Sequence, residues 1–583
     1  MTVLAASGAP GAAASGAAGA RSPFAWRGIV EGSYGRPWTH PERVRMLRWM
    51  AAHGMNVYVH APKDDLRQRA YWREPYPAPE LRAYRAEIRL AARLGVRWVP
   101  NVSPALPLIP SRTLPGRPAS RPLCFSCPGD LEAVLAKLGP FARAGARTFM
   151  ASFDDVRKTF SDPRDTAAFG AGDAAYGRAT GGFLTRLRAA LRRRWRGSRL
   201  LTVVADYAGS ADSGYLRGLR SQLAGGIEVL WTGTSIPARQ WTRGDARAYG
   251  RLIGRRPLVW ENWTNVDAAA GTRIFLGPYV RRTDVRGAVG GFLFNPANDP
   301  DLNLLPLATA ADWMRDPGRY RPRRSWLDAV RALAGPGRRR DLLRAWAETS
   351  YSTKLDYTDA PTFARAARAF LRAYRAGGDS GAARARLVRE LLAVRDAGRG
   401  LRSLPDRALV TQAAPFLDAA RVAAGAGLAG IRLLAAERPA IALRRAPEGG
   451  FRLRLAPPAV AATGALRASF GRAAARFAAQ RRLVYGWRGG MAVDFPPFPV
   501  PPNAMDTFLG RVRALDAAFA PLARRAASDL AATLDGRALR PGAGRRAWLL
   551  LPRSACAGLL VVRDGAGGRT ALRLPACRGG RGR

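Results

Sequence analysis

The first half of the chain alternates short apolar, β-branched runs with longer amphipathic stretches. From Arg27 to about Arg315, each run ends in polar residues or in glycine and proline, and the stretch that follows has helical period. The eight runs are 28–32, 56–60, 97–102, 147–153, 200–206, 227–232, 258–262 and 289–295. Eight strand–helix units of this total length predict an α/β fold, a (β/α)8 TIM barrel, which usually takes about 250 residues.

Helix boundary signals favour the same fold. Thr39 offers a capping hydroxyl, Pro41 a first-turn proline, and Gly54 a stop after the amphipathic stretch between them. Segment 78–94 repeats the arrangement ahead of the third run. A doubly wound open sheet is the rival fold, but it needs a glycine-rich phosphate turn after its first strand, and residues 30–35 lack that spacing.

The second half has a different pattern. Beyond Tyr320 it becomes rich in alanine, arginine and leucine with helical period, and one helix face carries Phe363, Ala367, Phe370 and Tyr374. The predicted domains are a flexible tail at 1–24, the barrel at 25–320, a mainly helical domain at 321–536, and a small β unit with a basic tail at 537–583. No function is predicted for residues 321–583.

The chain carries an extreme positive charge, but the distribution of that charge is not typical of a nucleic-acid-binding protein. The formal charge is +51, and of 94 basic residues only Lys63, Lys137, Lys158 and Lys354 are lysines. The arginines are spread over helical segments instead of forming one stripe with interleaved aromatic residues, which a single-strand binding groove requires. We therefore expect no specific nucleic-acid partner, only nonspecific adhesion to polyanions at low salt.

The four cysteines do not predict a disulfide framework. Cys124 and Cys127 have CxxC spacing, but no second pair of cysteines or histidines accompanies them, so a zinc site is not predicted. We expect no cofactor. Cys556 and Cys577 bracket a predicted hairpin and could form a disulfide, which would indicate an oxidising compartment.

The sequence leaves the compartment open. Residues 1–22 carry no recognisable secretion signal, and no apolar run approaches the 18 or more residues of a membrane span. A soluble protein is expected. It is either secreted, with its signal upstream of the sequence given, or cytoplasmic.

Polar and aromatic residues stand at the carboxyl end of each of the eight predicted strands. They are Glu31, Gly32 and Tyr34; Lys63, Asp64 and Asp65; Ser103; Asp154 and Asp155; Asp206 and Tyr207; Trp231 and Thr232; Trp260, Glu261 and Asn262; and Asn295 and Asn298. Barrel enzymes do their chemistry at the carboxyl ends of the strands. Carboxylates, amides, a lysine and aromatic rings on one rim indicate a site that binds hydroxyl groups and stacks on a sugar.

Asp154 and Asp155 are the candidate catalytic pair. Because neighbouring like charges repel, one carboxyl is expected to have a raised pKa while the other stays ionised. The alternative is structural, with Asp155 capping the next helix and Asp154 solvated. Two facing carboxylates about 5–5.5 Å apart are the usual retaining arrangement, and adjacent residues point in different directions. Attack by the 2-acetamido group of the substrate removes that requirement.

Several motifs stand in one order along the first half of the chain: VEGSYGRPW at 30–38, NVYVHAPKDD at 56–65, WRE at 72–74, FDD at 153–155, WTG at 231–233, WEN at 260–262 and FLGPY at 275–279. Together they resemble glycoside hydrolase family 84, which includes protein O-GlcNAcases, bacterial β-N-acetylglucosaminidases and some enzymes named hyaluronidases. The resemblance runs from about Gly28 to Leu307. It implies a retaining, metal-independent exo-β-N-acetylglucosaminidase that acts through an oxazoline intermediate on GlcNAc-containing glycans or glycoproteins.

The resemblance also implies roles for individual residues. Asp154 would orient the acetamide, and Asp155 would be the general acid and then the general base. The sugar would be bound by Gly32, Lys63, Tyr207, Trp260, Asn262, Asp267 and Asn295.

Departures from the family pattern bear on the substrate. Ser33 replaces an aromatic residue, Glu261 replaces Asp, and the loop after the third strand is expanded, with Ala105 in place of Gly. Two alternatives stay open: an endo-acting hyaluronidase-like enzyme, and a catalytically silent glycan-binding protein.

Overall fold

The computed structural model describes residues 22–108, 113–265, 274–280, 284–376, 381–437, 440–445, 451–456, 460–485, 503–523, 530–534, 537–539, 548–551, 558–564 and 569–574. The chain divides into two compact units. The first takes in residues through Pro336 together with the short segment Ser352–Tyr357, and the second includes 337–351 and most of the chain from Thr358 onward.

The first unit is a closed barrel of eight parallel strands in sequence order, which confirms the predicted fold class. The strands are β1 (Trp26–Glu31), β2 (Val57–His60), β3 (Arg97–Val102), β4 (Thr148–Ser152), β5 (Arg199–Val203), β6 (Ile227–Trp231), β7 (Leu258–Glu261) and β8 (Gly291–Phe294). Strand β1 closes the ring, because Ile29 pairs with Tyr58 of β2 on one side and with Phe294 of β8 on the other.

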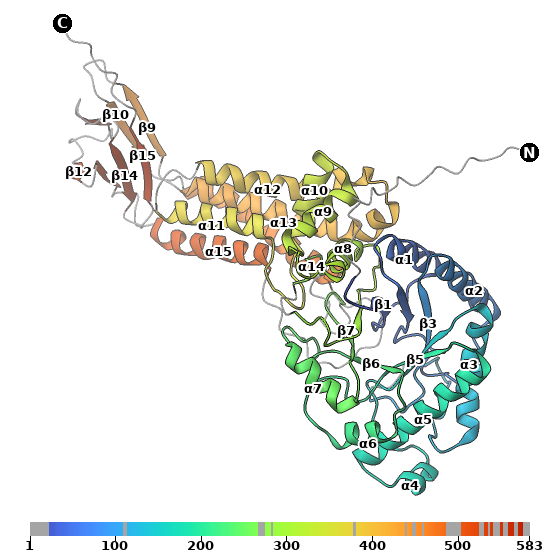
Figure 1. Ribbon diagram of the computed structural model, residues 1–583. Coiled ribbons are helices and arrows are strands. Elements are labelled where there is room, and N and C mark those ends of the chain that lie inside the picture. Colours follow the sequence, from blue (N-terminus) through green and yellow to red (C-terminus); the bar gives the residue numbers. More distant parts are fainter. Residues whose placement is uncertain are drawn as a thin grey trace, which may run out of the picture. The chain divides into compact units, whose positions relative to one another are not determined.

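Nine helices of the described chain belong to this unit: α1 (His40–Ala52), α2 (Ala78–Arg93), α3 (Pro128–Ala144), α4 (Pro163–Phe169), α5 (Asp173–Arg194), α6 (Gly214–Gln222), α7 (Arg243–Ile253), α8 (Leu304–Arg315) and α9 (Pro322–Ala334). Helices α1 to α7 lie around the outside of the strands (Figure 1). Helix α1 begins where the sequence predicts, with Thr39 and Glu42 forming a reciprocal capping box.

The barrel core has two layers because alternate side chains on a strand point to opposite faces. Inward-facing residues fill the barrel, among them Val30, Val59, Val99, Met150, Leu201, Leu230, Leu258 and Leu293. Outward-facing residues such as Ile29, Tyr58 and Phe292 pack under the helices, against Leu47 and Trp313 among others. Since each fully buried aliphatic side chain stabilises by about 1.5–3 kcal/mol, these layers fix the strand ends that carry the polar residues.

The expanded segment between β3 and α3 is anchored at both ends. Cys124 and Cys127 are joined by a disulfide, a bond that the CxxC spacing alone did not predict. Asp165 accepts hydrogen bonds from the backbone N–H groups of Phe125 and Ser126. At the other end, the N–H of Leu108 donates to the carbonyl of Asp155. The segment therefore contacts the turn that follows β4.

The second unit is a helical bundle with two small sheets. Its helices are α10 (Arg338–Glu348), α11 (Pro361–Ala376), α12 (Gly381–Gly400), α13 (Arg407–Ala436), α14 (Val460–Tyr485) and α15 (Ala504–Ala523), with a short 3-10 turn at Leu401–Ser403. One sheet pairs β9 (Ala440–Arg445), β10 (Phe451–Ala456) and β13 (Trp548–Leu551). The other pairs β11 (Leu530–Leu534), β12 (Arg537–Leu539), β14 (Leu559–Asp564) and β15 (Arg569–Arg573). Cys556 and Cys577 lie outside the described residues.

Within the described residues, α13 alone is long and apolar enough to cross a membrane by length and composition. In its most apolar window, 61% of the residues are buried inside the protein. It packs against α12 and α14, as the central helix of a bundle does.

Arginines that are far apart in the sequence come together in the second unit. A cavity of about 1040 Å³ is lined by seven of them, from four helices: Arg338, Arg339, Arg395, Arg399, Arg421, Arg472 and Arg476. Asp396 is the one acidic residue of the described lining, and no aromatic residue is among these lining residues. The cavity concentrates positive charge where the sequence shows only scattered arginines.

We expect the arginines of this cavity to contribute more to nonspecific polyanion binding than an equal number of exposed arginines elsewhere. Glutamine at Arg395, Arg399, Arg472 and Arg476 should make the slope of log Kd against log salt, for a short DNA duplex, shallower by up to about 3–4, since each neutralised phosphate contributes about 0.9. The matched control removes four exposed arginines of α2, Arg82, Arg85, Arg89 and Arg93. Equal changes in both variants would mean that net charge alone governs binding.

Candidate active site

A cavity of about 210 Å³ opens at the carboxyl ends of the barrel strands. Six of the seven predicted sugar-binding residues line it with both aspartates: Gly32, Lys63, Asp154, Asp155, Tyr207, Trp260, Asn262 and Asn295. The seventh, Asp267, lies outside the described residues. The cavity is smaller than the ~300–1,000 Å³ typical of drug-sized ligands, so it suits a single sugar ring.

Asp154 and Asp155 come just after β4, beyond Phe153, and their closest partners differ. Asp154 is 5% exposed, and its Oδ2 contacts the ammonium of Lys63. Its Oδ1 is buried and has no hydrogen-bond partner among the described residues. A buried acceptor in this state can take a hydrogen bond from a bound ligand, because leaving it unsatisfied costs about 1–3 kcal/mol.

Asp155 is held by two phenols. Tyr207 donates to Oδ1 at 2.7 Å, Tyr34 donates to Oδ2 at 2.9 Å, and the Lys63 ammonium lies 3.7 Å from Oδ2. Burial by itself raises the pKa of Asp155, but Lys63, the Tyr207 hydrogen bond, Arg69 and Tyr34 outweigh it, so that pKa lies below its ordinary value. The upward shift expected from like-charge repulsion is therefore not found at Asp155, because these partners compensate its charge.

The structural alternative for Asp155 also fails. The next helix, α4, is capped by Asp162, whose side chain accepts from the N–H of Arg164. Asp155 instead has a left-handed backbone, with φ +52°, and its carbonyl accepts from Leu108. Non-glycine residues at positive φ are uncommon and often mark functional positions. The turn directs the carboxyl of Asp155 toward Tyr34 and Tyr207.

Trp260 and Gly32 form one wall of the cavity by close approach. A Cβ at position 32 would lie 2.3 Å from Trp260 Cζ2, so only glycine fits there. The N–H of Gly32 donates to Asn295 Oδ1 at 3.1 Å. Asn262 Oδ1 accepts from both Trp260 Nε1, at 3.0 Å, and Asn295 Nδ2, at 2.9 Å. The wall is thus a connected hydrogen-bonded unit.

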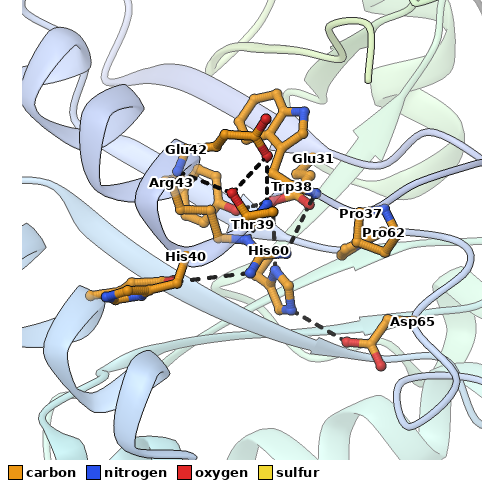
Figure 2. Close-up of polar contacts among 12 residues, drawn as sticks. Glu31, Pro37, Trp38, Thr39, His40, Glu42, Arg43, His60, Pro62 and Asp65 are labelled. Atoms are coloured by element: carbon orange, nitrogen blue, oxygen red, sulfur yellow. Dashed lines mark hydrogen bonds and ion pairs between the residues drawn. The ribbon is translucent and has the colours of Figure 1, made fainter. Parts of the chain in front are cut away.

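A buried charged network lies at the ends of β1 and β2, next to Gly32 and Lys63 in the sequence (Figure 2). Glu31 accepts two hydrogen bonds from Arg43, at 2.9 and 3.0 Å, and also bonds Tyr58. His60 lies 3.8 Å from Glu31 and 3.4 Å from Asp65. Burial and Arg43 lower the pKa of His60, but the contacts with Asp65 and Glu31 outweigh them and hold it above its ordinary value.

Other polar rim residues stabilise loops instead of lining the cavity. Asp64 accepts from the N–H of Gly35, Glu261 accepts from Tyr279, and Asp206 accepts from Ser213. The described residues contain one possible group of metal ligands, Cys124, Cys127 and Asp162, and its two sulfurs are already joined in the disulfide.

Several lining residues were not among the predicted site residues: Tyr34, Val203, Thr232, Ile236, Pro237, Asn265 and Lys354. Tyr34 and Thr232 stand at strand ends, so their position was a usable signal. Asn265 and Lys354 carried none, because neither ends a strand and Lys354 comes after the predicted barrel.

Comparisons with known proteins point to one enzyme family. The family described as beta-N-acetylglucosaminidase matches residues 27–348. The protein O-GlcNAcases of Rattus norvegicus and Mus musculus are each 29% identical over 316 residues, which is 53% of this chain and 32% of each relative. The chain thus matches about a third of their length.

A solved structure of a mutant Thermobaculum terrenum O-GlcNAc hydrolase superposes with a TM-score of 0.69 at 22% identity. The superposition covers 86% of this chain and 97% of the Thermobaculum terrenum chain, which shows that the two have a common fold. Since the family match takes in more than half of the chain and every strand of the barrel but the first residue of β1, the protein belongs to the β-N-acetylglucosaminidases of glycoside hydrolase family 84.

Proposed function

We propose that this protein is a retaining exo-β-N-acetylglucosaminidase that removes terminal β-linked GlcNAc from glycoconjugates through an oxazoline intermediate. The observation that carries the proposal is the pair of unequal carboxylates in a one-sugar cavity. Asp154 presents a buried acceptor oxygen, and Asp155 is held by two phenols. This pair suits a substrate that supplies its own nucleophile.

In the first step, the acetamide oxygen attacks the anomeric carbon as the bond to the leaving oxygen breaks. Asp154 Oδ1 accepts the acetamide N–H, which increases the electron density on the attacking oxygen. Asp155, in its protonated form, gives its proton to the leaving oxygen. In the second step, Asp155 takes a proton from water as the water opens the oxazoline, and the product retains its configuration.

Tyr207 links substrate binding to the protonation of Asp155. In the free protein its hydroxyl donates to Asp155 and helps to keep that pKa low. An acetamide oxygen bound nearby would compete for the same hydroxyl. Loss of the Tyr207 bond raises the pKa of Asp155, so binding moves the carboxyl toward the acid form that the first step needs.

The acetamide requirement tests the proposal. The wild type should hydrolyse 4-nitrophenyl N-acetyl-β-glucosaminide at least about 10⁴-fold faster than 4-nitrophenyl β-glucoside, because only the first substrate carries the nucleophile and an effective molarity of about 10⁵ M or more is typical of such groups. Turnover of both at similar rates would refute substrate assistance. Binding of GlcNAc without turnover would instead support the glycan-binding alternative.

The endo-acting alternative has one observation in its favour, the positive charge of the chain, which would attract an anionic polymer. The one-sugar volume of the cavity opposes it. Release of monosaccharide from the chain end supports the exo reading, whereas internal fragments from a hyaluronan polymer would overturn it.

A further inference from the structure

Two of the four lysines in the chain line the same small cavity. Lys63 was predicted from its position after β2, whereas Lys354 comes from Ser352–Tyr357, beyond the barrel in sequence but within its compact unit. In a chain with 90 arginines, these two lysines give the cavity compact ammonium groups in place of the planar guanidinium that the chain uses elsewhere.

The segment that carries Lys354 is firmly held. Ser352, Thr353, Lys354 and Leu355 are at most 4% exposed, and Leu355 belongs to the barrel core cluster. The N–H of Lys354 donates to the carbonyl of Trp263 at 3.2 Å. The Arg239 guanidinium lies 4.6 Å from the centre of the Tyr357 ring. These contacts fix the backbone from which the ammonium reaches the cavity.

The ammonium meets the cavity beside Asn265. Lys354 Nζ donates to Asn265 Oδ1 at 2.7 Å, and both side chains line the space that also holds Asp154 and Asp155. An ammonium carries three donor hydrogens and no acceptor, so its chemistry in a cavity is to hold oxygen.

We propose that Lys354, held by Asn265, is a specificity-determining residue that donates a hydrogen bond to one hydroxyl of the terminal sugar. This inference rests on the proposed function and adds a contact from outside the barrel sequence. A site built to bind a hydroxyl rejects the analogue that lacks it, because its buried polar groups then stay unpaired. Lys354 would therefore distinguish sugars that differ at that one position.

The test compares Lys354→Met with Lys137→Met on 4-nitrophenyl N-acetyl-β-glucosaminide and its 3-, 4- and 6-deoxy analogues. Lys137 is a matched control, since it is 5% exposed and donates to the carbonyl of Glu74, away from the cavity. We expect Lys354→Met to raise KM about 10–100-fold for the parent and for two analogues, as for a lost hydrogen bond to a charged group. For the analogue that lacks the bound hydroxyl, the substitution should raise KM less than about 3-fold. Lys137→Met should leave the ratios of KM among the four substrates unchanged.

An equal increase in KM for all four substrates, or no increase for any of them, would overturn the role of Lys354 in specificity. If the wild type turns over none of them, the proposed function fails, and calorimetric binding of GlcNAc and its deoxy analogues to the same two variants tests the contact independently. A uniform affinity loss in that experiment refutes the contact, and a loss confined to sugars that keep one hydroxyl supports it.

Discussion

Asparagine at Asp155 is expected to lower kcat/KM about 10²–10⁴-fold for an aryl N-acetyl-β-glucosaminide with a poor leaving group, the usual contribution of a general acid. For a good leaving group such as 2,4-dinitrophenolate, the loss should be much smaller, because that oxygen departs without a proton. Asparagine has nearly the shape of aspartate and still accepts from Tyr207 or Tyr34, so the cavity should persist. Steady-state kinetics on the two substrates measures the difference.

The matched control is Asp206→Asn. Asp206 also follows a barrel strand, but it accepts from Ser213, pairs with Lys158 and does not line the cavity. Its loss should change kcat/KM less than about 3-fold on either substrate, since it lies outside the reacting groups. Equal losses on good and poor leaving groups in Asp155→Asn would show that Asp155 does not donate the proton.

Methionine at Arg43 is expected to cost about 3–5 kcal/mol of unfolding free energy, because it removes the bidentate guanidinium partner of the buried Glu31 carboxylate. Arg43 and Glu31 are 7% and 5% exposed in their side chains, and the pair is bidentate. Glu87 would also lose a neighbouring cation, at 4.0 Å. Urea unfolding followed by tryptophan fluorescence measures the effect, and Arg315→Met, which removes an exposed ion pair with Asp312, should cost less than about 1 kcal/mol.

The same pair predicts the acid sensitivity of the barrel. Burial raises the pKa of Glu31, but Arg43 and His60 outweigh it and lower that pKa to about 2, from an ordinary value of 4.5. A depressed pKa stabilises the folded protein at pH above 4.5, and that contribution is lost as pH falls toward 2. Arg43→Met should therefore weaken the loss of stability between pH 4.5 and 2. An unchanged slope in that window would contradict the role of Arg43.

Local sequence pattern was enough for the barrel and for the position of the aspartates. Strand β3 spans the predicted residues 97–102, and Asp154 and Asp155 stand just beyond β4. This follows from two short-range regularities, the apolar period of a buried strand and the rule that parallel strands end on one rim. Once eight strands close, their polar ends must converge, so the cavity-lining residues at strand ends could be named without coordinates.

The hydrogen-bond partners and the pKa of the site carboxylates could be found only from distances in the structure. The adjacent like charges predicted a raised pKa for one of the two carboxyls. The pKa of Asp155 is instead lowered, because two phenols donate to it and an ammonium lies nearby, and no spacing rule reveals these contacts. The roles predicted for the site residues came from the family resemblance. The close contact with Trp260, seen only in the structure, explains why position 32 is glycine. Electrostatics depends on separations of a few ångströms between residues far apart in the chain.

The sequence by itself thus determined the fold class, the catalytic candidates and the family, since each is written in local periodicity or in ordered motifs. Only the tertiary structure decided that Lys354 reaches the cavity from beyond the barrel, that Cys124 and Cys127 are bonded, and that seven arginines from four helices line one cavity. These features depend on packing between segments that are far apart in the sequence. Burial of apolar surface drives that packing, and because it is non-directional, a local sequence pattern does not indicate which distant segments meet.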